Sequence, residues 1–107
     1  MLDFPIADTH VHLWDPRRFH YPWLEDLPPL KRPFLPADYR RACGPIQVDA
    51  LVFVQCEVAP EQGLDEARWV AELVSEEPRL QALIPWTPLE QGAAARPWLE
   101  ELAQVPL

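Results

Sequence analysis

Short apolar runs in this chain are typical of β-strands. Residues 50–54 read Ala-Leu-Val-Phe-Val, a continuous stretch whose length and β-branched residues favour a strand buried on both faces. Residues 80–86 form a second run of this kind. Residues 6–13 predict another strand, which ends before the Pro-marked turn Asp15-Pro16. We therefore expect three strands.

Helical periodicity separates these runs. The clearest helix is expected over residues 60–77, with Pro78 just past its end. Its apolar positions are Leu64, Ala67, Val70, Ala71 and Val74. Shorter helices are expected over residues 36–42, with Pro36 in the first helical position, and over residues 93–104. Strands that alternate with helices in this order predict an α/β fold with a parallel sheet.

The connection over residues 14–49 is rich in proline and aromatic residues. The chain has 14 prolines and 3 glycines, and half of the prolines lie between Leu13 and Asp49. Proline restricts φ, so this segment should be ordered and stiff. Long loops in small domains usually carry function. We expect this one to contain a short helix and to fold over an active site, with Trp14 beside the substrate pocket.

Composition and charge fit a single globular domain over residues 1–107. The chain is 49% hydrophobic and 24% charged. Nine Lys and Arg against 17 Asp and Glu give a formal charge of −8 without a basic cluster, so nucleic-acid and membrane binding are not expected. The sequence shows no apolar run of the ~18 residues that a membrane span needs. With no leader pattern and only two cysteines, a cytoplasmic location is expected.

The string Asp8-Thr9-His10-Val11-His12 carries the strongest chemical signal. Side chains two residues apart on a strand share a face, so His10 and His12 can direct their imidazoles to one point. Neutral imidazole binds Zn²⁺ and related divalent cations well. Asp8 is expected on the same face, one step deeper, where it would hold a histidine N–H. The alternative is two half-buried histidines packed at a sheet edge.

Polar residues also follow the second predicted strand. Gln55 and Glu57 share a face by the same spacing, and active sites of parallel α/β folds lie at the C-terminal ends of strands. Both would therefore flank the substrate pocket, unless they are only a solvated strand end. Trp86 follows the third strand and would wall the same pocket, with core packing as the alternative. Solvated helix faces are predicted for Glu61, Glu72, Glu76, Glu77, Glu100 and Glu101.

The strings Ala7–Pro16 and Tyr21–Leu24 resemble the amidohydrolase-related ("amidohydrolase 2") family of metal-dependent hydrolases. The likeness continues, in order, over residues 52–55, 63–69 and 85–90, and it is closest to the branch of sugar-acid lactonases. Members are (β/α)8 TIM barrels, which need ~250 residues. The resemblance therefore implies that this chain corresponds to the first three βα units, the N-terminal part of such a barrel.

The resemblance also implies a function. His10 and His12 match the metal pair of the first strand, and Gln55 matches a polar position after the second. The substrate would be a small lactone, hydrolysed by water that a divalent metal, zinc by expectation, activates. The remaining family ligands and the catalytic base have no counterpart here, so the chain alone is expected to be inactive. Two alternatives stay open: a non-catalytic α/β module that self-associates as a homo-oligomer, and a decarboxylase of the same superfamily.

Overall fold

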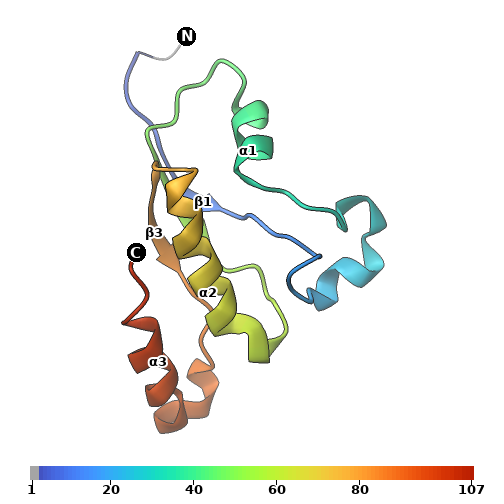
Figure 1. Ribbon diagram of the computed structural model, residues 1–107, viewed down its shortest axis with the longest axis vertical. Coiled ribbons are helices and arrows are strands. Elements are labelled where there is room, and N and C mark those ends of the chain that lie inside the picture. Colours follow the sequence, from blue (N-terminus) through green and yellow to red (C-terminus); the bar gives the residue numbers. More distant parts are fainter. Residues whose placement is uncertain (1–2) are drawn as a thin grey trace.

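A three-stranded parallel sheet is the centre of the computed structural model, which describes residues 3–107; Met1 and Leu2 lie outside the described residues. The strands β1 (Ala7–Val11), β2 (Ala50–Val54) and β3 (Leu80–Ile84) lie side by side in chain order (Figure 1). All three fall within the segments predicted from the apolar pattern. The α/β class with parallel strands is therefore confirmed.

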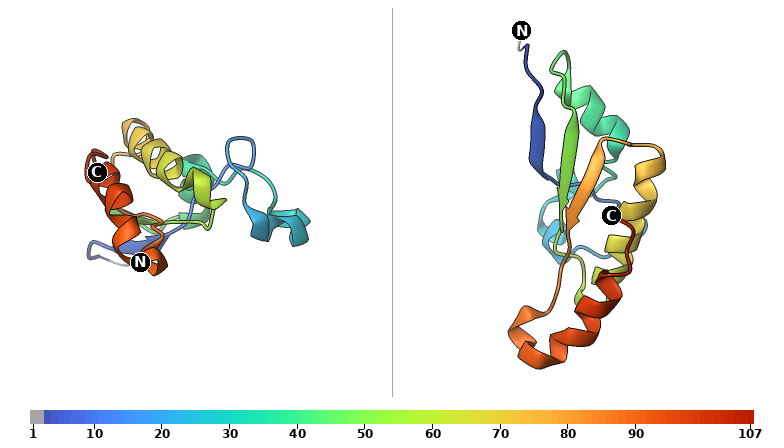
Figure 2. Two further views of the ribbon diagram at one scale, coloured as in Figure 1. Left: turned by 90° about the horizontal axis from the view of Figure 1, so that it is seen from below. Right: turned by 90° about the vertical axis from the view of Figure 1, so that its left-hand side faces the viewer.

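The helices follow the strands as the sequence predicts. Helices α1 (Pro36–Cys43) and α2 (Gly63–Glu72) lie on one side of the sheet, and α3 (Arg96–Leu102) packs beside α2 (Figure 2). Short 3-10 turns extend α2 at both ends. Helix α3 begins later than predicted because the residues before it, Leu89–Ala95, form a 3-10 helix, which is itself interrupted at Gly92 with φ 60°. Within residues 3–107, no helix combines the length and the apolarity that a membrane crossing requires.

Strand β2 buries only one of its faces. Leu51 and Phe53 are 1% and 0% exposed and belong to the same apolar core as Val70 of α2. Val52 and Val54 alternate with them and are half-buried. The prediction that both faces of this strand are buried is therefore correct for one face only, the face that the described helices cover. The opposite face of the sheet is open in this part of the chain.

Glu77 corrects one of the sequence predictions. It is 2% exposed rather than solvated, and its carboxylate accepts hydrogen bonds from Arg79 at 2.9 Å and from Arg40 of α1 at 3.1 Å. These guanidinium partners, Arg79 foremost, hold the pKa of Glu77 below its usual range. Arg79 also donates to the main-chain oxygen of Val48. The cluster therefore ties α1 to the start of β3, at the end of the sheet away from the histidines.

The Pro- and aromatic-rich connection is ordered by hydrogen bonds. Residues Trp14 and Phe34 form an antiparallel bridge, and the indole of Trp14 donates to the main-chain oxygen of Leu30 at 3.0 Å. Between them lie two 3-10 turns, over Pro22–Asp26 and Pro28–Leu30. The segment projects beside the sheet, at the right of Figure 1. The bridge and the indole bond tie the two ends of the segment together.

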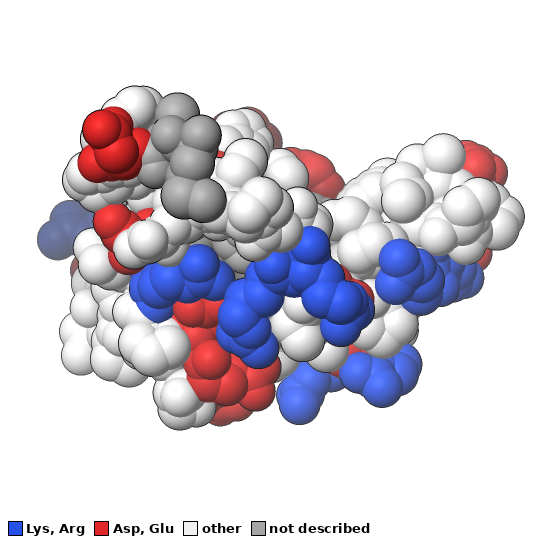
Figure 3. Space-filling view, turned by 90° about the horizontal axis from the view of Figure 1, so that it is seen from above, with Lys and Arg blue, Asp and Glu red and all other residues white. Residues whose placement is uncertain are grey.

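Basic side chains gather on one face of this acidic chain (Figure 3). Six of its nine Lys and Arg residues lie within residues 17–41. The grouping reflects this concentration of basic residues in one segment of the sequence, which the expectation of no basic cluster did not take into account. Much of this charge is paired, as in the contacts of Arg17 with Asp15 and of Lys31 with Glu25.

Candidate functional site

His10 and His12 converge at the end of β1. Their Nε2 atoms lie 3.1 Å apart, and both side chains are exposed on the open face of the sheet. The ring centroids are 4.9 Å apart, with an angle of 73° between the planes. The structure therefore brings the two predicted ligand atoms to one point.

The orientation of His12 is fixed by the neighbouring strand. Its Nδ1 lies 2.9 Å from the main-chain oxygen of Val54, at the end of β2. A carbonyl oxygen can only accept a hydrogen bond, so Nδ1 carries the proton and Nε2 keeps its lone pair. Metal-binding histidines are held in this way, with the other ring nitrogen donating to a carbonyl or carboxylate.

The separation of the two nitrogens fits a shared cation. Zinc–nitrogen bonds of about 2.0–2.1 Å, at angles between octahedral and tetrahedral values, place two ligand nitrogens roughly 2.9–3.4 Å apart. The 3.1 Å between His10 and His12 falls in this range. Within residues 3–107, however, no group of three or more His, Cys, Asp and Glu side chains is placed to hold a metal. The described residues thus offer two ligands, where a catalytic zinc usually has three.

Asp8 takes a different place from the one expected. The pairing of β1 with β2 shifts between Asp8 and Val11, so the alternation of faces is broken just before the histidines. Asp8 pairs with buried Leu51, and its carboxylate accepts hydrogen bonds from the Tyr39 hydroxyl at 2.7 Å and the His10 main-chain N–H at 3.3 Å. It supports the strand that carries the pair, with no recorded bond to an imidazole.

A cavity of about 330 Å³ opens beside the histidine pair. Its lining residues are His12, Trp14, Trp23, Gln55, Cys56 and Glu57. This volume is in the range of small-molecule sites, which begin near ~300 Å³. Three of the predicted pocket residues, Trp14, Gln55 and Glu57, are thus brought together with a predicted ligand.

Gln55 and Glu57, which both line this cavity, are bonded to each other. The Gln55 side-chain amide donates to the Glu57 carboxylate at 2.8 Å, and the Glu57 main-chain N–H donates to Gln55 Oε1 at 2.7 Å. Glu57 has φ 51°, in the left-handed region that costs non-glycine residues about 1–2 kcal/mol. Residues in this conformation persist where the surrounding structure holds them, and they cluster at active sites and ligand-binding segments in proteins.

Two tryptophans form the wall of the cavity. The rings of Trp14 and Trp23 meet edge to face, with centroids 5.5 Å apart, and Trp14 also packs against Phe34 at 4.6 Å. The indole of Trp23 donates to the main-chain oxygen of Cys56 at 2.7 Å. The connection that carries both tryptophans is therefore fastened to the end of β2.

Trp86 does not line this cavity. Its ring packs edge to face against Trp98 of α3, at 5.4 Å, and lies against Gly63 at the start of α2. The half-buried ring is thus packed between α2 and α3, outside the main apolar core and away from the cavity. The polar atom Nε1 of Trp98 is buried there without a recorded partner.

Glu66 is a residue of this region that the sequence reasoning missed. It lies on α2, is 1% exposed, and accepts the main-chain N–H of Cys56 at 3.1 Å. Burial raises the pKa of its carboxyl to about 7. Helical spacing could have indicated its burial, because Glu66 lies on the same buried stripe of α2 as Gly63 and Val70.

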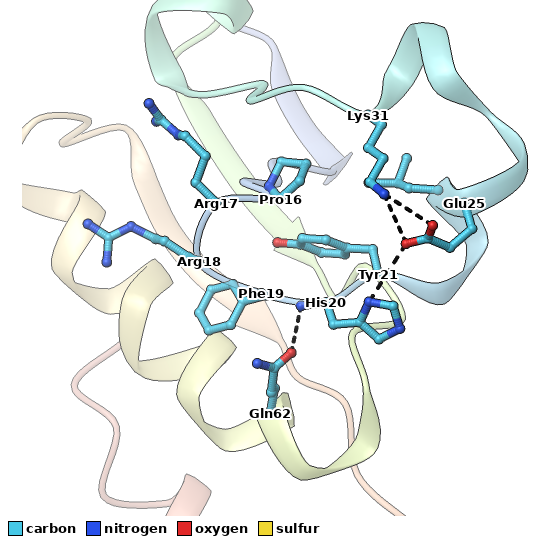
Figure 4. Close-up of a pocket in the computed structure, with 10 residues that line it drawn as sticks. Pro16, Arg17, Arg18, Phe19, His20, Tyr21, Glu25, Lys31 and Gln62 are labelled. Atoms are coloured by element: carbon cyan, nitrogen blue, oxygen red, sulfur yellow. Dashed lines mark hydrogen bonds and ion pairs between the residues drawn. The ribbon is translucent and has the colours of Figure 1, made fainter.

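A second hollow, of about 280 Å³, lies in the connection itself (Figure 4). Lys31 and His20 both face Glu25 there, at 3.0 and 3.9 Å, and the His20 main-chain N–H donates to Gln62. The third histidine is thus engaged away from the pair on β1. The cations of this hollow already have carboxylate partners, so it shows no unfilled binding function.

Solved structures similar to this chain include two amidohydrolases. Amidohydrolase 2 from Bifidobacterium longum subsp. infantis is 25% identical, with a TM-score of 0.68, over 80% of this chain and 34% of that one. A zinc-bound amidohydrolase from Burkholderia multivorans is 28% identical, with a TM-score of 0.67, over 91% of this chain and 33% of that one. No family model and no curated protein matches the sequence. The chain spans about a third of the length of these structures, and the likeness supports the amidohydrolase resemblance at that coarse level.

Proposed function

We propose that this chain supplies the first two metal ligands of a metal-dependent hydrolase of the amidohydrolase superfamily. The observation that carries the proposal is the convergence of His10 and His12 Nε2 at 3.1 Å, with His12 held by Val54. The likeness to a zinc-bound amidohydrolase supports zinc as the cation. A bound divalent cation supplies Lewis-acid activation of a carbonyl and of the attacking water.

We propose a sugar-acid lactone as the substrate. Trp14 and Trp23 present an apolar wall to the carbon skeleton of such a ring. The Gln55 amide and the Glu57 carboxylate supply donors and acceptors for its hydroxyl groups. The cavity adjoins His12, so a carbonyl group of the bound lactone would lie near the histidine pair.

The proposed architecture is the first part of a (β/α)8 barrel. The sheet is covered by helices on one side, as each strand of such a barrel is, and its open face carries the histidines. The coverage of about a third of each similar structure is consistent with a partial barrel. The third ligand and the catalytic base would then come from βα units beyond those described.

Self-association is a second candidate function, and one observation favours it. Ile84, on β3 at the edge of the sheet, is 53% exposed. An edge strand has main-chain groups without a partner strand, and an exposed apolar side chain on such a strand favours pairing with another chain. Sedimentation over a range of protein concentrations tests this candidate, because a monomer at all concentrations would exclude it.

Zinc titration tests the main proposal. Wild-type chain should bind Zn²⁺ weakly, and His10→Ala should lower the affinity more than ~10-fold. His12→Asn is the sharper variant, because its amide can still donate to Val54 while it lacks Nε2. His20→Ala is the matched control and should bind as wild type does. Equal affinity in all four proteins would contradict the proposal.

A further inference from the structure

Every polar group of Cys56 is held by a different part of the chain. Its main-chain N–H donates to Glu66 at 3.1 Å, and its main-chain oxygen accepts from the Trp23 indole at 2.7 Å. Its thiol lies 3.3 Å from the main-chain oxygen of Leu13 and 3.6 Å from His12 Nδ1. Cys56 is 5% exposed, and burial raises the pKa of the thiol, so it is no nucleophile. Its role is that of an anchored backbone position.

The residues on either side of this anchor face the cavity. Gln55 and Glu57 bond to each other across Cys56, and Glu57 holds a left-handed backbone. Such a conformation persists only where surrounding contacts over-determine it. The peptide units around Cys56 are therefore where these contacts must act.

Glu66 supplies the contact from the helix layer. A carboxyl that is 1% exposed is costly, and an apolar side chain of similar size often packs more stably at such a position. The carboxyl pKa of about 7 reflects this burial, with the charge of Glu57 adding to it. Packing of α2 against the sheet therefore does not explain why residue 66 is an acid. The hydrogen bond that its carboxyl accepts from the Cys56 N–H does explain it.

We propose that Glu66 is a positioning residue for the cavity, because its bond to the Cys56 N–H fixes the backbone that aims Gln55 and Glu57 at a bound substrate. That a substrate binds in this cavity rests on the proposed function. The anchoring of the backbone by Glu66 can be measured without metal or substrate. Failure of the anchoring proposal is therefore distinguishable from failure of the proposed function.

Amide hydrogen exchange of the full chain, followed by NMR, tests the anchoring. Glu66→Leu has no acceptor and should exchange the Cys56 amide about tenfold faster or more, with the Glu57 amide and the Trp23 indole also affected. Glu66→Gln keeps an acceptor oxygen and should rescue the protection. Glu72→Leu, at an exposed position of the same helix, is the matched control and should exchange as wild type does. The amides of Phe53 and Val70 report the core.

The outcomes separate positioning from general stability. Loss confined to the Cys56 region in Glu66→Leu, with rescue in Glu66→Gln, supports the proposal. An equal loss at Phe53 and Val70 would show a merely structural residue and overturn it, as would an unchanged Cys56 amide. If Glu66→Leu does not fold, a pH titration of the Cys56 amide proton replaces it. The chemical shift of this proton should change across neutral pH in wild type, and this change should be absent in Glu66→Gln. The same titration in both proteins would reject the bond.

Discussion

The main-chain oxygen of Val54 accepts a hydrogen bond from His12 Nδ1 at 2.9 Å, so the end of β2 orients a side chain that follows β1. The bond requires the proton on Nδ1 and leaves the lone pair of Nε2 directed at His10, 3.1 Å away. Neutral Nε2 is the form that a metal ion needs. The neighbouring strand thus prepares His12 as a ligand before any cation binds.

The tautomer of His12 is the first prediction. In the neutral form of the ring, long-range proton–nitrogen NMR correlations should show a protonated Nδ1 and an unprotonated Nε2, because the main-chain oxygen of Val54 accepts from Nδ1. Zinc should shift the Nε2 resonance and leave Nδ1 protonated. His20, which has no such carbonyl partner recorded, is the internal control and should not respond to zinc. A His12 ring protonated on Nε2 would contradict this assignment.

Glu66 should make stability fall as the pH rises. Its folded pKa, about 7, lies above the ordinary value of 4.5, so the native state holds the proton more tightly. Its stabilising contribution is complete below about pH 4.5 and is lost as the pH passes 7, at a total of about 3 kcal/mol. Urea unfolding at about pH 5.5 and about pH 8.5 should capture about 2 kcal/mol of this change. Glu66→Gln should remove this component, and Glu72→Gln should not.

Glu77 should act in the opposite direction. Its pKa is lowered, so its contribution is present above the ordinary carboxyl range and is lost as the pH falls through the folded pKa. Glu77→Gln should cost about 2 kcal/mol at neutral pH, because Arg79 and Arg40 lose a charged partner. The exposed neighbour variant Glu76→Gln is the control. The difference between Glu77→Gln and wild type should shrink in acid, and a constant difference would argue against the ion pair.

The fold was largely predictable because it follows from local patterns. The apolar run of β2 and the prolines around α1 and α2 act over a few residues, and each element lies close to its predicted place. The predictions that were wrong or missing depended on tertiary contacts. The burial of Glu77 involves a hydrogen bond from Arg40 of α1, a tertiary contact that the local pattern does not contain. Glu66 was missed because the buried stripe of α2 is rotated by about one residue from the purely apolar one.

The site was predictable where strand alternation holds. His10 approaches His12, and Gln55 approaches Glu57, because each pair is spaced by two residues at the end of a strand; the two strands are neighbours, so His12, Gln55 and Glu57 line one cavity. The alternation fails at Asp8, where a shift in pairing places its carboxylate near Tyr39. Such an irregularity depends on how two strands match in register, which the local pattern of one strand does not contain.

Replacement of Gly63 by alanine should destabilise the fold. An added Cβ would lie 2.7 Å from Trp86 Cε3 and 3.3 Å from Trp98 Cζ2, so both rings would have to shift. Its φ of −60° suits alanine, and the backbone therefore offers no other penalty. Gly63→Ala should lower the free energy of unfolding by about 1–3 kcal/mol. A double-mutant cycle with Trp86→Phe checks the cause, because additive effects would mean that the rings do not clash with the methyl group.

The 107-residue chain by itself should show no appreciable lactonase activity. Its described residues bring two imidazoles together but no third ligand. A positioned base contributes ~10²–10⁴-fold, and no described carboxylate is placed as one opposite the pair. Sugar-acid lactones should therefore hydrolyse at the same rate with wild type and with a His10→Ala/His12→Ala double variant, with zinc present in both assays. Zinc-dependent turnover by wild type alone would mean that these three βα units, or a second copy of them, complete the site, and the proposed division of ligands along a longer barrel would be wrong.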